Sequence, residues 1–267
     1  MAEYHISTTG SDLADGSLVT PWATIAKAHK APVAAGDIIY IHSGTYSEII
    51  SSDAFIPVCG APTNLITIKN YGNDPVTLNG RIRTYGTGSS LCTNYKYQGF
   101  AIVEGINGQS GYRMTGDNTT GVLEFVDMEI YSCSNSSIYL GYTNQNMGVI
   151  RISGGLYHHS SGGTETSGIL IGGHAEIYIS GAQCYNNENK GINFRNEVGT
   201  TGSIKYCNIH DNVESGLDWP GRFSDISYNT CSNNGILDTE VDEWGDKNFG
   251  FQSSATGNIA HHNLIVN

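Results

Sequence analysis

Short runs of alternating apolar and polar residues recur along the chain at a nearly constant interval. The stretch IYISGAQCYNNENKGINFRN (177–196) aligns without a gap with GSIKYCNIHDNVESGLDWPG (202–221), and the alignment superimposes Gly191 on Gly216. Apolar and cysteine side chains coincide at alternate positions before each glycine. Because alternate residues of a strand point to opposite sides, this pattern predicts short strands that each bury one side.

The same frame extends from residue 125 to the end of the chain, and it predicts two series of inward-facing side chains. The first series is Phe125, Ile152, Ile179, Ile204, Ile226 and Ile259, and the second is Ile130, Tyr157, Cys184, Ile209, Cys231 and Leu264. Successive members of the first series are 27, 27, 25, 22 and 33 residues apart. Such spacing is typical of one turn of a β-solenoid, and stacked turns would bury the core that one turn cannot.

Between the predicted strands lie residues suited to tight corners. Asn and Gly adopt the left-handed backbone conformation that such corners need, and the asparagines fall there, at positions 186, 187, 212, 233 and 234. We therefore expect structural roles for these asparagines, and core filling by Cys184 and Cys231. The histidine pairs at 158–159 and 261–262 also fall at corners, where we expect them on the surface.

The segment before the repeats, residues 4–48, has a different pattern. It predicts a strand, a polar turn, a short helix near 23–31, a second strand in DIIYIHSG (37–44) and a turn at 44–46. A solenoid needs its open end covered, so we expect this segment to be an N-terminal cap. The predicted organisation is one domain, 1–267, with the cap and first strands in 1–50 and the solenoid coils in 51–267.

The motifs of this segment carry a family resemblance. The series TGSD (9–12), DGS (15–17), PWATI (21–25), AGDIIYI (35–41) and GTY (44–46) resembles the opening of right-handed parallel β-helix proteins of the pectate-lyase-like superfamily. The nearest pattern is that of polysaccharide lyase family nine. The resemblance implies an all-β, single-stranded right-handed parallel β-helix, and it specifies the fold better than the activity because non-catalytic members share this opening.

Composition and charge narrow the classes of partner. The chain has 34 Gly, 16 Tyr and only 14% charged residues, which is typical of a turn-rich β protein. A net charge of −12 argues against nucleic acid as the main partner. An acidic polysaccharide stays compatible, because a local group of Lys and Arg can bind carboxylates. No run approaches the ~20 apolar residues of a membrane span, so no membrane partner is expected.

Cysteines and chain ends give weaker expectations. The six cysteines lack CxxC or metal-ligand spacing, so we expect packed thiols.

The start has no cationic and apolar leader, and we expect an extracellular or virion-associated protein whose signal is absent here. The sequence stops within the repeat, so either the chain continues or another subunit covers that end. A homo-oligomer, a trimer if the protein is a viral fibre, would do so.

Ionisable residues gather on one predicted outward face. The strands after the repeat glycines should point two columns outward, Leu170, Asn193, Asp218 and Gln252 in one and Gly172, Arg195, Pro220 and Ser254 in the other. Lys190, Arg195 and Asp218 would then lie within one or two rungs, about 5 to 10 Å apart at ~4.8 Å per rung. β-Elimination on a uronate needs a cation for the carboxylate, a base for the C5 proton and an acid for the leaving oxygen. Lys190 suits the base, because a cationic neighbour such as Arg195 would lower its pKa, and Asn193 is a candidate substrate-binding residue.

The resemblance to family nine also implies a calcium site and a catalytic Lys. Asp218 matches one Asp of that calcium pattern. Lys190 stands where another Asp would be, Glu214 and Ser215 replace an Asp pair, and Gln252 stands where the catalytic Lys would be. Calcium on Asp218 and Glu214 is therefore the one cofactor candidate, and these departures favour a site assisted by Lys and Arg.

Two further groups of candidates lie outside this cluster. The insertion GILDTEVDEWGDKNFG (235–250) would overhang the outward face, with Trp244 stacking on a sugar and Lys247 pointing toward Asp218. Arg222 is another candidate substrate-binding residue. His174 and Tyr142 are candidates for an acid and base pair of the kind that other uronate lyases and mannuronan epimerases use.

Together, these features predict an enzyme or binding protein for an acidic polysaccharide. The leading hypothesis is a polysaccharide lyase that cleaves a uronate-containing polymer by β-elimination. A C5-epimerase would share the proton abstraction and would reprotonate the opposite face. A non-catalytic module for glycan binding or for a viral fibre is the third hypothesis.

Overall fold

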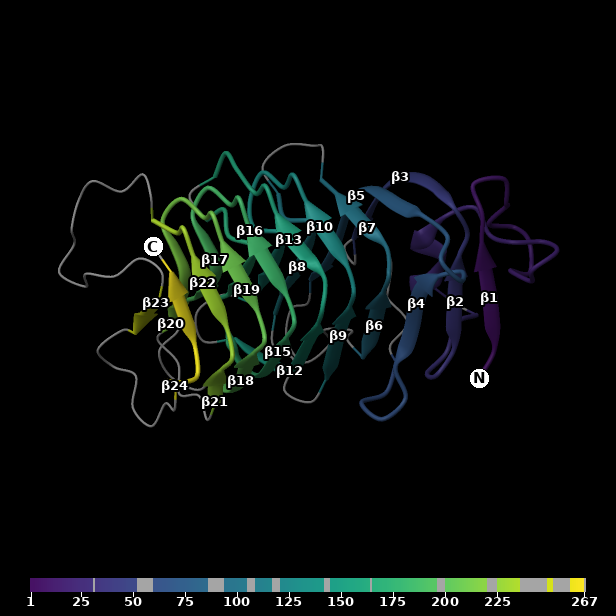
Figure 1. Cartoon of the computed structure of the whole chain (residues 1–267). Coiled ribbons are helices and arrows are strands. Elements are labelled where there is room, and N and C mark those ends of the chain that lie inside the picture. The colour runs from purple at the N-terminus through teal and green to yellow at the C-terminus, as the bar shows by residue number, and fades with distance from the viewer. Residues whose placement is uncertain are drawn as a thin grey trace.

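A computed structural model describes residues 1–30, 32–51, 60–85, 94–104, 109–116, 121–141, 145–163, 165–195, 200–219, 225–235, 249–251 and 260–266. The chain winds along one axis as a right-handed parallel β-helix, with its termini at opposite ends (Figure 1). All strand pairs between the named strands are parallel, so each turn stacks on the one before it. The predicted fold class is confirmed.

One side of the solenoid is a ten-stranded sheet, here called face 1. In spatial order, its strands are β1 (Glu3–Ile6), β2 (Ile38–Ile41), β4 (Ile66–Asn70), β6 (Tyr95–Gln98), β9 (Val122–Val126), β12 (Asn146–Ser153), β15 (His174–Ser180), β18 (Thr201–Lys205), β21 (Asp225–Ser227) and β24 (Ala260–His261). The strands of the N-terminal segment, β1 and β2, already belong to this sheet.

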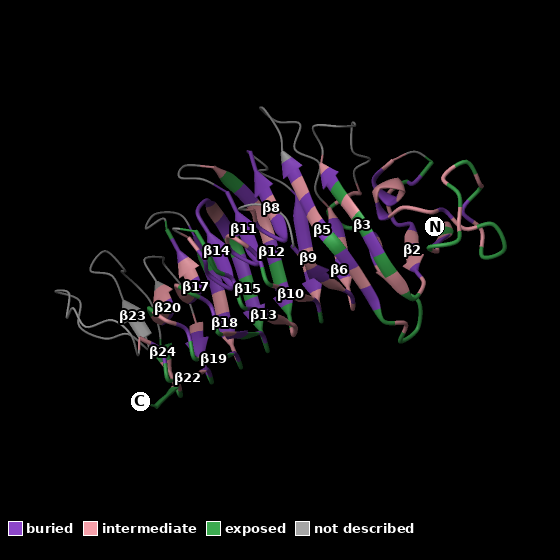
Figure 2. Ribbon diagram, turned by 90° about the horizontal axis from the view of Figure 1, so that it is seen from above, coloured by how far each residue is buried: buried purple, intermediate pink, exposed green. Residues whose placement is uncertain are grey.

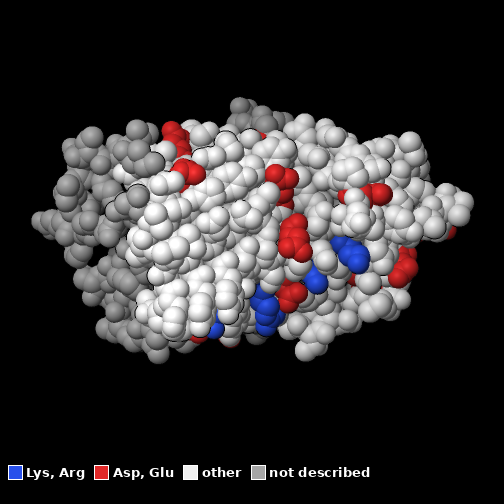
Figure 3. All heavy atoms as spheres, in the orientation of Figure 1, with Lys and Arg blue, Asp and Glu red and all other residues white. Residues whose placement is uncertain are grey.

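Two further faces complete each turn. Face 2 consists of β7 (Ala101–Val103), β10 (Glu129–Tyr131), β13 (Leu156–His158), β16 (Gln183–Tyr185), β19 (Asn208–His210), β22 (Thr230–Ser232) and β25 (Leu264–Val266). Face 3 consists of β8 (Tyr112–Thr115), β11 (Ile138–Leu140), β14 (Ile169–Ile171), β17 (Lys190–Phe194), β20 (Ser215–Trp219) and β23 (Phe249–Phe251). The surface over β16, β19 and β22 of face 2 is largely without charged side chains (Figure 3).

Faces 2 and 3 meet at one long strand. β5 (Val76–Tyr85) pairs with β3 (Gly44–Ser51) on one side, while on the other its first half pairs with β7 and its second half with β8. Gly80 lies between the halves with φ of 155°, a conformation that side chains rarely adopt. Along both β3 and β5, buried residues are interspersed with exposed ones (Figure 2). The expected turn at 44–46 was wrong, because these residues begin β3.

The expected helix near 23–31 is the 3-10 helix η1 (Ile25–His29). The carboxylate of Glu48 accepts hydrogen bonds from the backbone N–H groups of Ile25 (2.6 Å) and Ala26 (2.9 Å), which satisfies the first turn. Trp22 is fully buried just before the helix. In the part of the chain that the structure describes, no helix has the length and apolar character needed to cross a membrane.

The predicted inward ladders are confirmed up to the last turn. Phe125, Ile152, Ile179, Ile204 and Ile226 are aligned and buried, as are Ile130, Tyr157, Cys184, Ile209 and Cys231. In the last turn the register was wrong by one residue. Ile226 pairs with Ala260, and Cys231 pairs with Ile265, while Leu264 is 57% exposed. Ile259 lies outside the described residues.

A hydrogen bond between asparagines accounts for this register. The side-chain oxygen of Asn263 accepts hydrogen bonds from the N–H (3.0 Å) and the amide (3.0 Å) of Asn229 in the turn before. Since a shift of one residue would move every side chain to the other side of the strand, this bond places Ile265, and not Leu264, in the register of Cys231, although Ile265 is itself 47% exposed. Apolar residues alone, at 264 and 265, could not distinguish the two registers.

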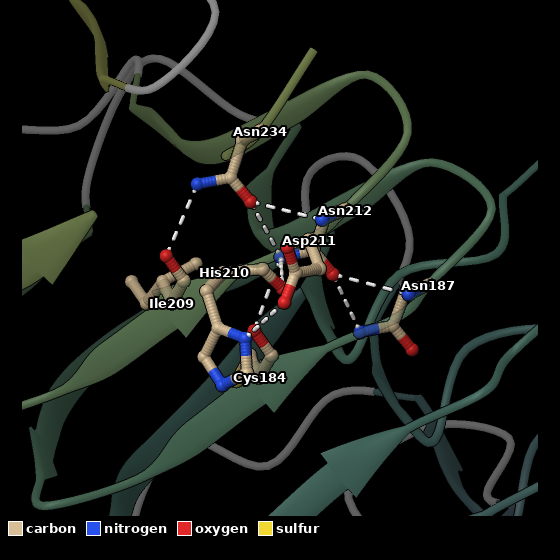
Figure 4. A network of polar contacts seen from close by, with 7 residues as sticks. All are labelled: Cys184, Asn187, Ile209, His210, Asp211, Asn212 and Asn234. Atoms are coloured by element: carbon tan, nitrogen blue, oxygen red, sulfur yellow. Dashed lines mark hydrogen bonds and ion pairs between the residues drawn. The ribbon is translucent and has the colours of Figure 1, made fainter. Parts of the chain in front are cut away.

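A second asparagine ladder lies at the corner between faces 2 and 3, and it confirms the structural role predicted there. Asn187, Asn212 and Asn234 are at most 7% exposed. The amide of Asn187 donates to Oδ1 of Asn212 (2.9 Å), and the amide of Asn212 donates to Oδ1 of Asn234 (2.9 Å), as Figure 4 shows. The preceding residues Asn186 and Asn233 take the left-handed conformation, with φ of 53° and 52°. The ladder thus satisfies buried polar groups in every turn it crosses.

The four cysteines in the described residues are buried, free thiols. Burial raises the pKa of Cys133, Cys207 and Cys231 to about 12, and it raises the pKa of Cys184 well above its usual range. These thiols therefore stay protonated at neutral pH and fill the core, as the sequence predicted.

One expectation about histidines was wrong. His158 is 7% exposed, because its ring is sandwiched between Tyr131 and Tyr185 on neighbouring strands of face 2. The neighbouring His159 is exposed at the corner, as expected, with φ of 55°.

Candidate functional site

The predicted ionisable cluster lines a hollow of about 310 Å³ on the outer side of face 3. We call it the face-3 pocket. Its lining residues come from the adjacent strands β17 and β20, from the corners before them and from the residue after β17, and they are Asn189, Lys190, Asn193, Phe194, Arg195, Glu214 and Asp218. The strands are in parallel register, with Lys190 beside Ser215 and Asn193 beside Asp218. The pocket is thus built from two successive turns.

The alternation of the two strands places the polar side chains in the pocket. Ile192, Phe194 and Leu217 are buried, whereas Asn193, between the first two, and Asp218, next to Leu217, point outward. Phe194 reaches the pocket only at its base, since it is 1% exposed.

Gly191, the second residue of β17, has a steric reason. A β-carbon at Gly191 would lie 2.9 Å from the amide nitrogen of Asn212 and 2.7 Å from the carbonyl oxygen of Gly216. A side chain there would push the asparagine ladder or the next strand away. The absence of a side chain at Gly191 therefore leaves room for Asn212 inside the corner, next to Lys190 on the outside.

The cations of the pocket are paired with carboxylates. Lys190 Nζ contacts Asp218 Oδ2, and the guanidinium of Arg195 contacts Glu165 Oε1. The side chains of Lys190 and Asp218 are 25% and 14% exposed, so this pair is largely shielded from solvent. The sequence predicted the proximity of Lys190 and Asp218. The contact that the structure gives Lys190 is to a carboxylate, whereas the base hypothesis relied on a cationic neighbour.

Glu165 was not among the predicted residues, although the repeat contains the signal. The stretch TETSGILIG (164–172) aligns with NENKGINFR (187–195), which superimposes Glu165 on Glu188 and Ser167 on Lys190. This alignment places Glu165 at the corner one turn before Lys190. From there its carboxylate reaches Arg195, which follows β17.

Two predicted members of the outward column are corrected. Leu170 pairs with Asn193 as expected, but it is fully buried. In the other direction, Asp218 pairs with Gly250, so Gln252 was assigned to this position wrongly, by two residues. The long insertion before β23 removed the spacing on which that assignment depended.

The remaining candidates are not in the pocket. His174 is the first residue of β15 on face 1, where it pairs with Asn146, and it does not line the face-3 pocket. Tyr142, Arg222, Trp244 and Lys247 lie outside the described residues.

The carboxylates that the structure describes at this site do not fit a calcium ion. Among the residues that the structure describes, no group of three or more His, Cys, Asp and Glu side chains is placed to hold a metal ion. Calcium takes six to eight oxygen ligands, and Asp218 is already paired with Lys190. Asp218 and Glu214 therefore make a poor calcium site, and no catalytic role for the ion follows from them.

Comparisons with known proteins support the fold. No family model matches the chain, and no curated protein matches it, so membership of polysaccharide lyase family nine stays a prediction. Among solved structures, GH136 lacto-N-biosidase from Eubacterium ramulus aligns with a TM-score of 0.60 at 13% identity, covering 99% of this chain and 61% of that one. The chain thus spans less than two thirds of that protein.

Two further structures were compared. A complex of XylC with xylose aligns with a TM-score of 0.52 at 11% identity, covering 98% of this chain and 68% of that one. Pectate lyase Pel9A aligns with a TM-score of 0.42 at 12% identity over 86% of this chain and 76% of that one, and at this score the likeness carries no argument. The first two likenesses establish a shared solenoid fold.

Proposed function

We propose that the protein cleaves an acidic, uronate-containing polysaccharide by β-elimination in the face-3 pocket. The observation that carries the proposal is the polar lining of that pocket, where two cations, two carboxylates and two amides meet on the outside of a parallel β-helix. Solved structures that share the fold include a lacto-N-biosidase and a protein bound to xylose, which supports a carbohydrate ligand.

The chemistry can be assigned to residues of the pocket. A uronate carboxylate would take the place of Glu165 at Arg195, which lowers the cost of removing the C5 proton. A base takes that proton, the electron pair forms the C4–C5 double bond, and the bond from C4 to the glycosidic oxygen breaks. The departing oxygen then takes a proton from an acid of the pocket.

Lys190 suits the acid better than the base. Its ammonium is held by Asp218, and an ammonium paired with a carboxylate is a proton donor. Glu214, which lines the same pocket, is then the candidate base. Asn189 and Asn193 are candidate hydrogen-bonding partners for sugar hydroxyls.

Glycoside hydrolysis is a second candidate, because two carboxylates, Glu214 and Asp218, line the same pocket. Glycosidases commonly use a pair of carboxyl groups, one as acid and one as base or nucleophile. In that reaction a neutral sugar would suffice, and no unsaturated product would form.

One experiment separates these reactions. The protein is incubated with pectate, alginate, glycosaminoglycans and xylan, each with calcium or with a chelator, while ultraviolet absorbance and new reducing ends are followed. Absorbance from unsaturated uronate ends rising with the reducing ends would support elimination. Reducing ends without absorbance would replace it with hydrolysis. If neither signal rises, the polymers are analysed by NMR, where inverted C5 centres would indicate epimerisation and unchanged polymer a binding module.

A variant pair tests the location of the reaction. Replacing both Lys190 and Arg195 with Ala should abolish turnover without unfolding the protein. The control is Lys205→Ala, because Lys205 forms a comparable ion pair with Asp225 on face 1, away from the pocket. Equal activity of both variants would move the reaction away from the face-3 pocket.

A further inference from the structure

A column of left-handed residues runs along the corner between faces 1 and 2. From Asp127 onward each turn places one such residue there, and their φ values lie between 49° and 69°; they are Asp127, Gly154, Gly181, Tyr206, Tyr228 and His262. Backbone hydrogen bonds connect successive members to the neighbouring turn, as from Gly181 N–H to the carbonyl of Lys205 (3.0 Å). Glycine is the residue that this conformation favours, and two turns use it. Tyr206 and Tyr228 occupy the same position in the next two turns, at a conformational cost that the corner itself does not require.

These two tyrosines point into solvent instead of into the core. Tyr206 is 60% exposed and Tyr228 is 47% exposed. Their rings are stacked with centroids 5.2 Å apart and planes 10° apart, and the ring of His262 continues the stack at 5.1 Å and 12°. On the side of Gly181, a β-carbon at that position would meet only the backbone of Gly154, at 3.7 and 3.8 Å, so no side chain of the described residues lies against it. The corner thus presents an ordered, exposed aromatic stack with one uncovered end.

A second aromatic stack runs parallel to the first on face 2. Its rings are Tyr131, His158, Tyr185 and His210, with successive centroids 5.1, 4.6 and 5.1 Å apart and planes within 15°. Between the two stacks lies a column of amide and hydroxyl side chains, Gln183, Asn208 and Thr230, in register on adjacent strands. Gln183 and Asn208 are exposed.

The strands of this surface carry few formal charges. The outward positions of β16, β19 and β22 hold no Asp, Glu, Lys or Arg, and Figure 3 shows the corresponding bare area, although His210 at the end of β19 contacts Asp211 at the adjoining corner (2.7 Å). The chain as a whole carries 25 acidic and 13 basic residues. We therefore do not expect this surface to bind phosphate, a basic peptide or an anionic polymer mainly through attraction between charges.

We propose that this surface, which we call the aromatic face, binds sugar rings of a polysaccharide outside the face-3 pocket. It is defined by Tyr206, Tyr228 and His262 at the corner, with Tyr185, His210, Gln183, Asn208 and Thr230 on face 2. The choice of a carbohydrate as ligand rests on the proposed function. Aromatic rings contact the C–H faces of pyranoses, and amides and hydroxyls exchange hydrogen bonds with sugar hydroxyls. Rungs repeat every ~4.8 Å, which is about the length of one pyranose, so neighbouring turns can meet neighbouring sugars.

This mode of binding has a signature in its salt dependence. Contacts through ring faces and neutral hydrogen bonds are not screened by ions, whereas attraction between charges is strongly weakened at about 1 M salt, where the Debye length is about 3 Å. Binding at the aromatic face should therefore persist at high salt. Binding of a uronate polymer at the face-3 pocket through Lys190 and Arg195 should weaken.

The test is affinity electrophoresis and equilibrium binding with pectate, alginate, xylan and hydroxyethylcellulose, at low salt and at about 1 M NaCl. We expect at least one polymer to retard the protein at both salt concentrations. Replacing Tyr206 and Tyr228 together with Ala should raise the dissociation constant about tenfold or more. The matched control is Tyr178→Ala, since Tyr178 is 38% exposed on β15 of face 1, outside both stacks, and should change binding by less than about twofold.

The same measurement is repeated in protein that carries Lys190→Ala and Arg195→Ala. Because retardation needs no turnover, loss of binding on Tyr206→Ala and Tyr228→Ala in this background would support the aromatic face even if no polymer were cleaved. If the parent protein cleaves a polymer and the tyrosine substitutions do not weaken binding, the proposed function stands and this inference is overturned. Equal retardation of the tyrosine and Tyr178 variants, binding abolished by salt, or no retardation by any of the four polymers would also overturn it. So would a change in oligomeric state on the tyrosine substitutions, measured by sedimentation, because the surface would then be a contact between copies.

Discussion

Lys190 and Asp218 form an ion pair across adjacent strands of face 3, between the ammonium of one turn and the carboxylate of the next. A second Lys–Asp pair, Lys205 and Asp225, joins adjacent strands of face 1. The second pair is more exposed, at 34% and 27% against 25% and 14%. The fold thus holds the same two residue types at two degrees of burial, and the more buried pair lines the face-3 pocket.

This difference predicts unequal coupling energies. Removing either Lys190 or Asp218 leaves the other charge partly buried without its partner, so a double-mutant cycle with alanine should give a coupling of about 1 kcal/mol or more. The cycle at Lys205 and Asp225 should give a smaller value because solvent screens that pair. Urea unfolding of the single and double variants measures both. Equal couplings, or none at Lys190 and Asp218, would contradict the prediction.

The asparagine ladder predicts a large loss of stability for Asn212→Ala. The amide of Asn212 donates to the carbonyl of Cys184 (3.0 Å) and to Asn234, and its oxygen accepts from Asn187. Removing the side chain leaves several buried groups unsatisfied, at about 1–3 kcal/mol each, so the free energy of unfolding should fall by about 3 kcal/mol or more.

The control for this substitution is Asn208→Ala, because Asn208 is the exposed first residue of β19 and lies outside the ladder. Its unfolding free energy should change little. Urea titrations of both variants at one pH and temperature provide the comparison. A loss below about 1 kcal/mol for Asn212→Ala would mean that water or relaxation replaces the ladder bonds.

Much of this fold could be predicted from the sequence because its core repeats. Each inward position, such as Ile152 or Ile179, is constrained by the turns above and below it, so a series of weak patterns becomes one strong signal. The prediction was wrong where a single polar contact decides the register. In the last turn, Ile265 rather than Leu264 takes the register of Cys231 because Asn263 bonds to Asn229, and hydrophobicity alone does not encode this.

The candidate site was predictable in part, for the same reason. The outward positions of β17 and β20 follow from the repeat, which brought Lys190, Asn193 and Asp218 together. Ion-pair partners do not follow from alternation, since long side chains such as Arg195 reach across a turn to Glu165. Burial of outward residues was also missed. Leu170 has the register of Asn193, yet it is covered.

The buried thiols predict a labelling pattern. Burial holds the pKa of Cys133, Cys207 and Cys231 near 12 and raises that of Cys184 well above its usual range, so none of the four is a thiolate at neutral pH. A soluble thiol reagent should leave these four unmodified in the folded protein and modify them in urea. Mass spectrometry of peptides after each treatment identifies the positions. Rapid native labelling at Cys184 would show that the core at that turn opens readily.

The buried His29 predicts that stability falls with pH below the ordinary histidine range. Burial lowers the pKa of His29 from 6.5 to about 4, and its Nε2 lies 3.0 Å from the hydroxyl of Tyr97. Between pH 6.5 and 4 the unfolded chain binds a proton that the folded chain does not, so this contribution is complete above pH 6.5 and is lost as the pH falls to about 4. The difference of about 2.5 pKa units corresponds to about 3 kcal/mol.

Urea unfolding at a series of pH values between 4 and 8 measures this effect in the parent protein and in His29→Gln. The substitution removes the group that titrates only in the unfolded chain, so the variant should lose less stability than the parent as the pH falls from 6.5 to about 4. Carboxyl groups titrate alike in both proteins, and the difference between the two curves isolates His29. Parallel curves for His29→Gln and the parent would mean that His29 can take up a proton in the folded core.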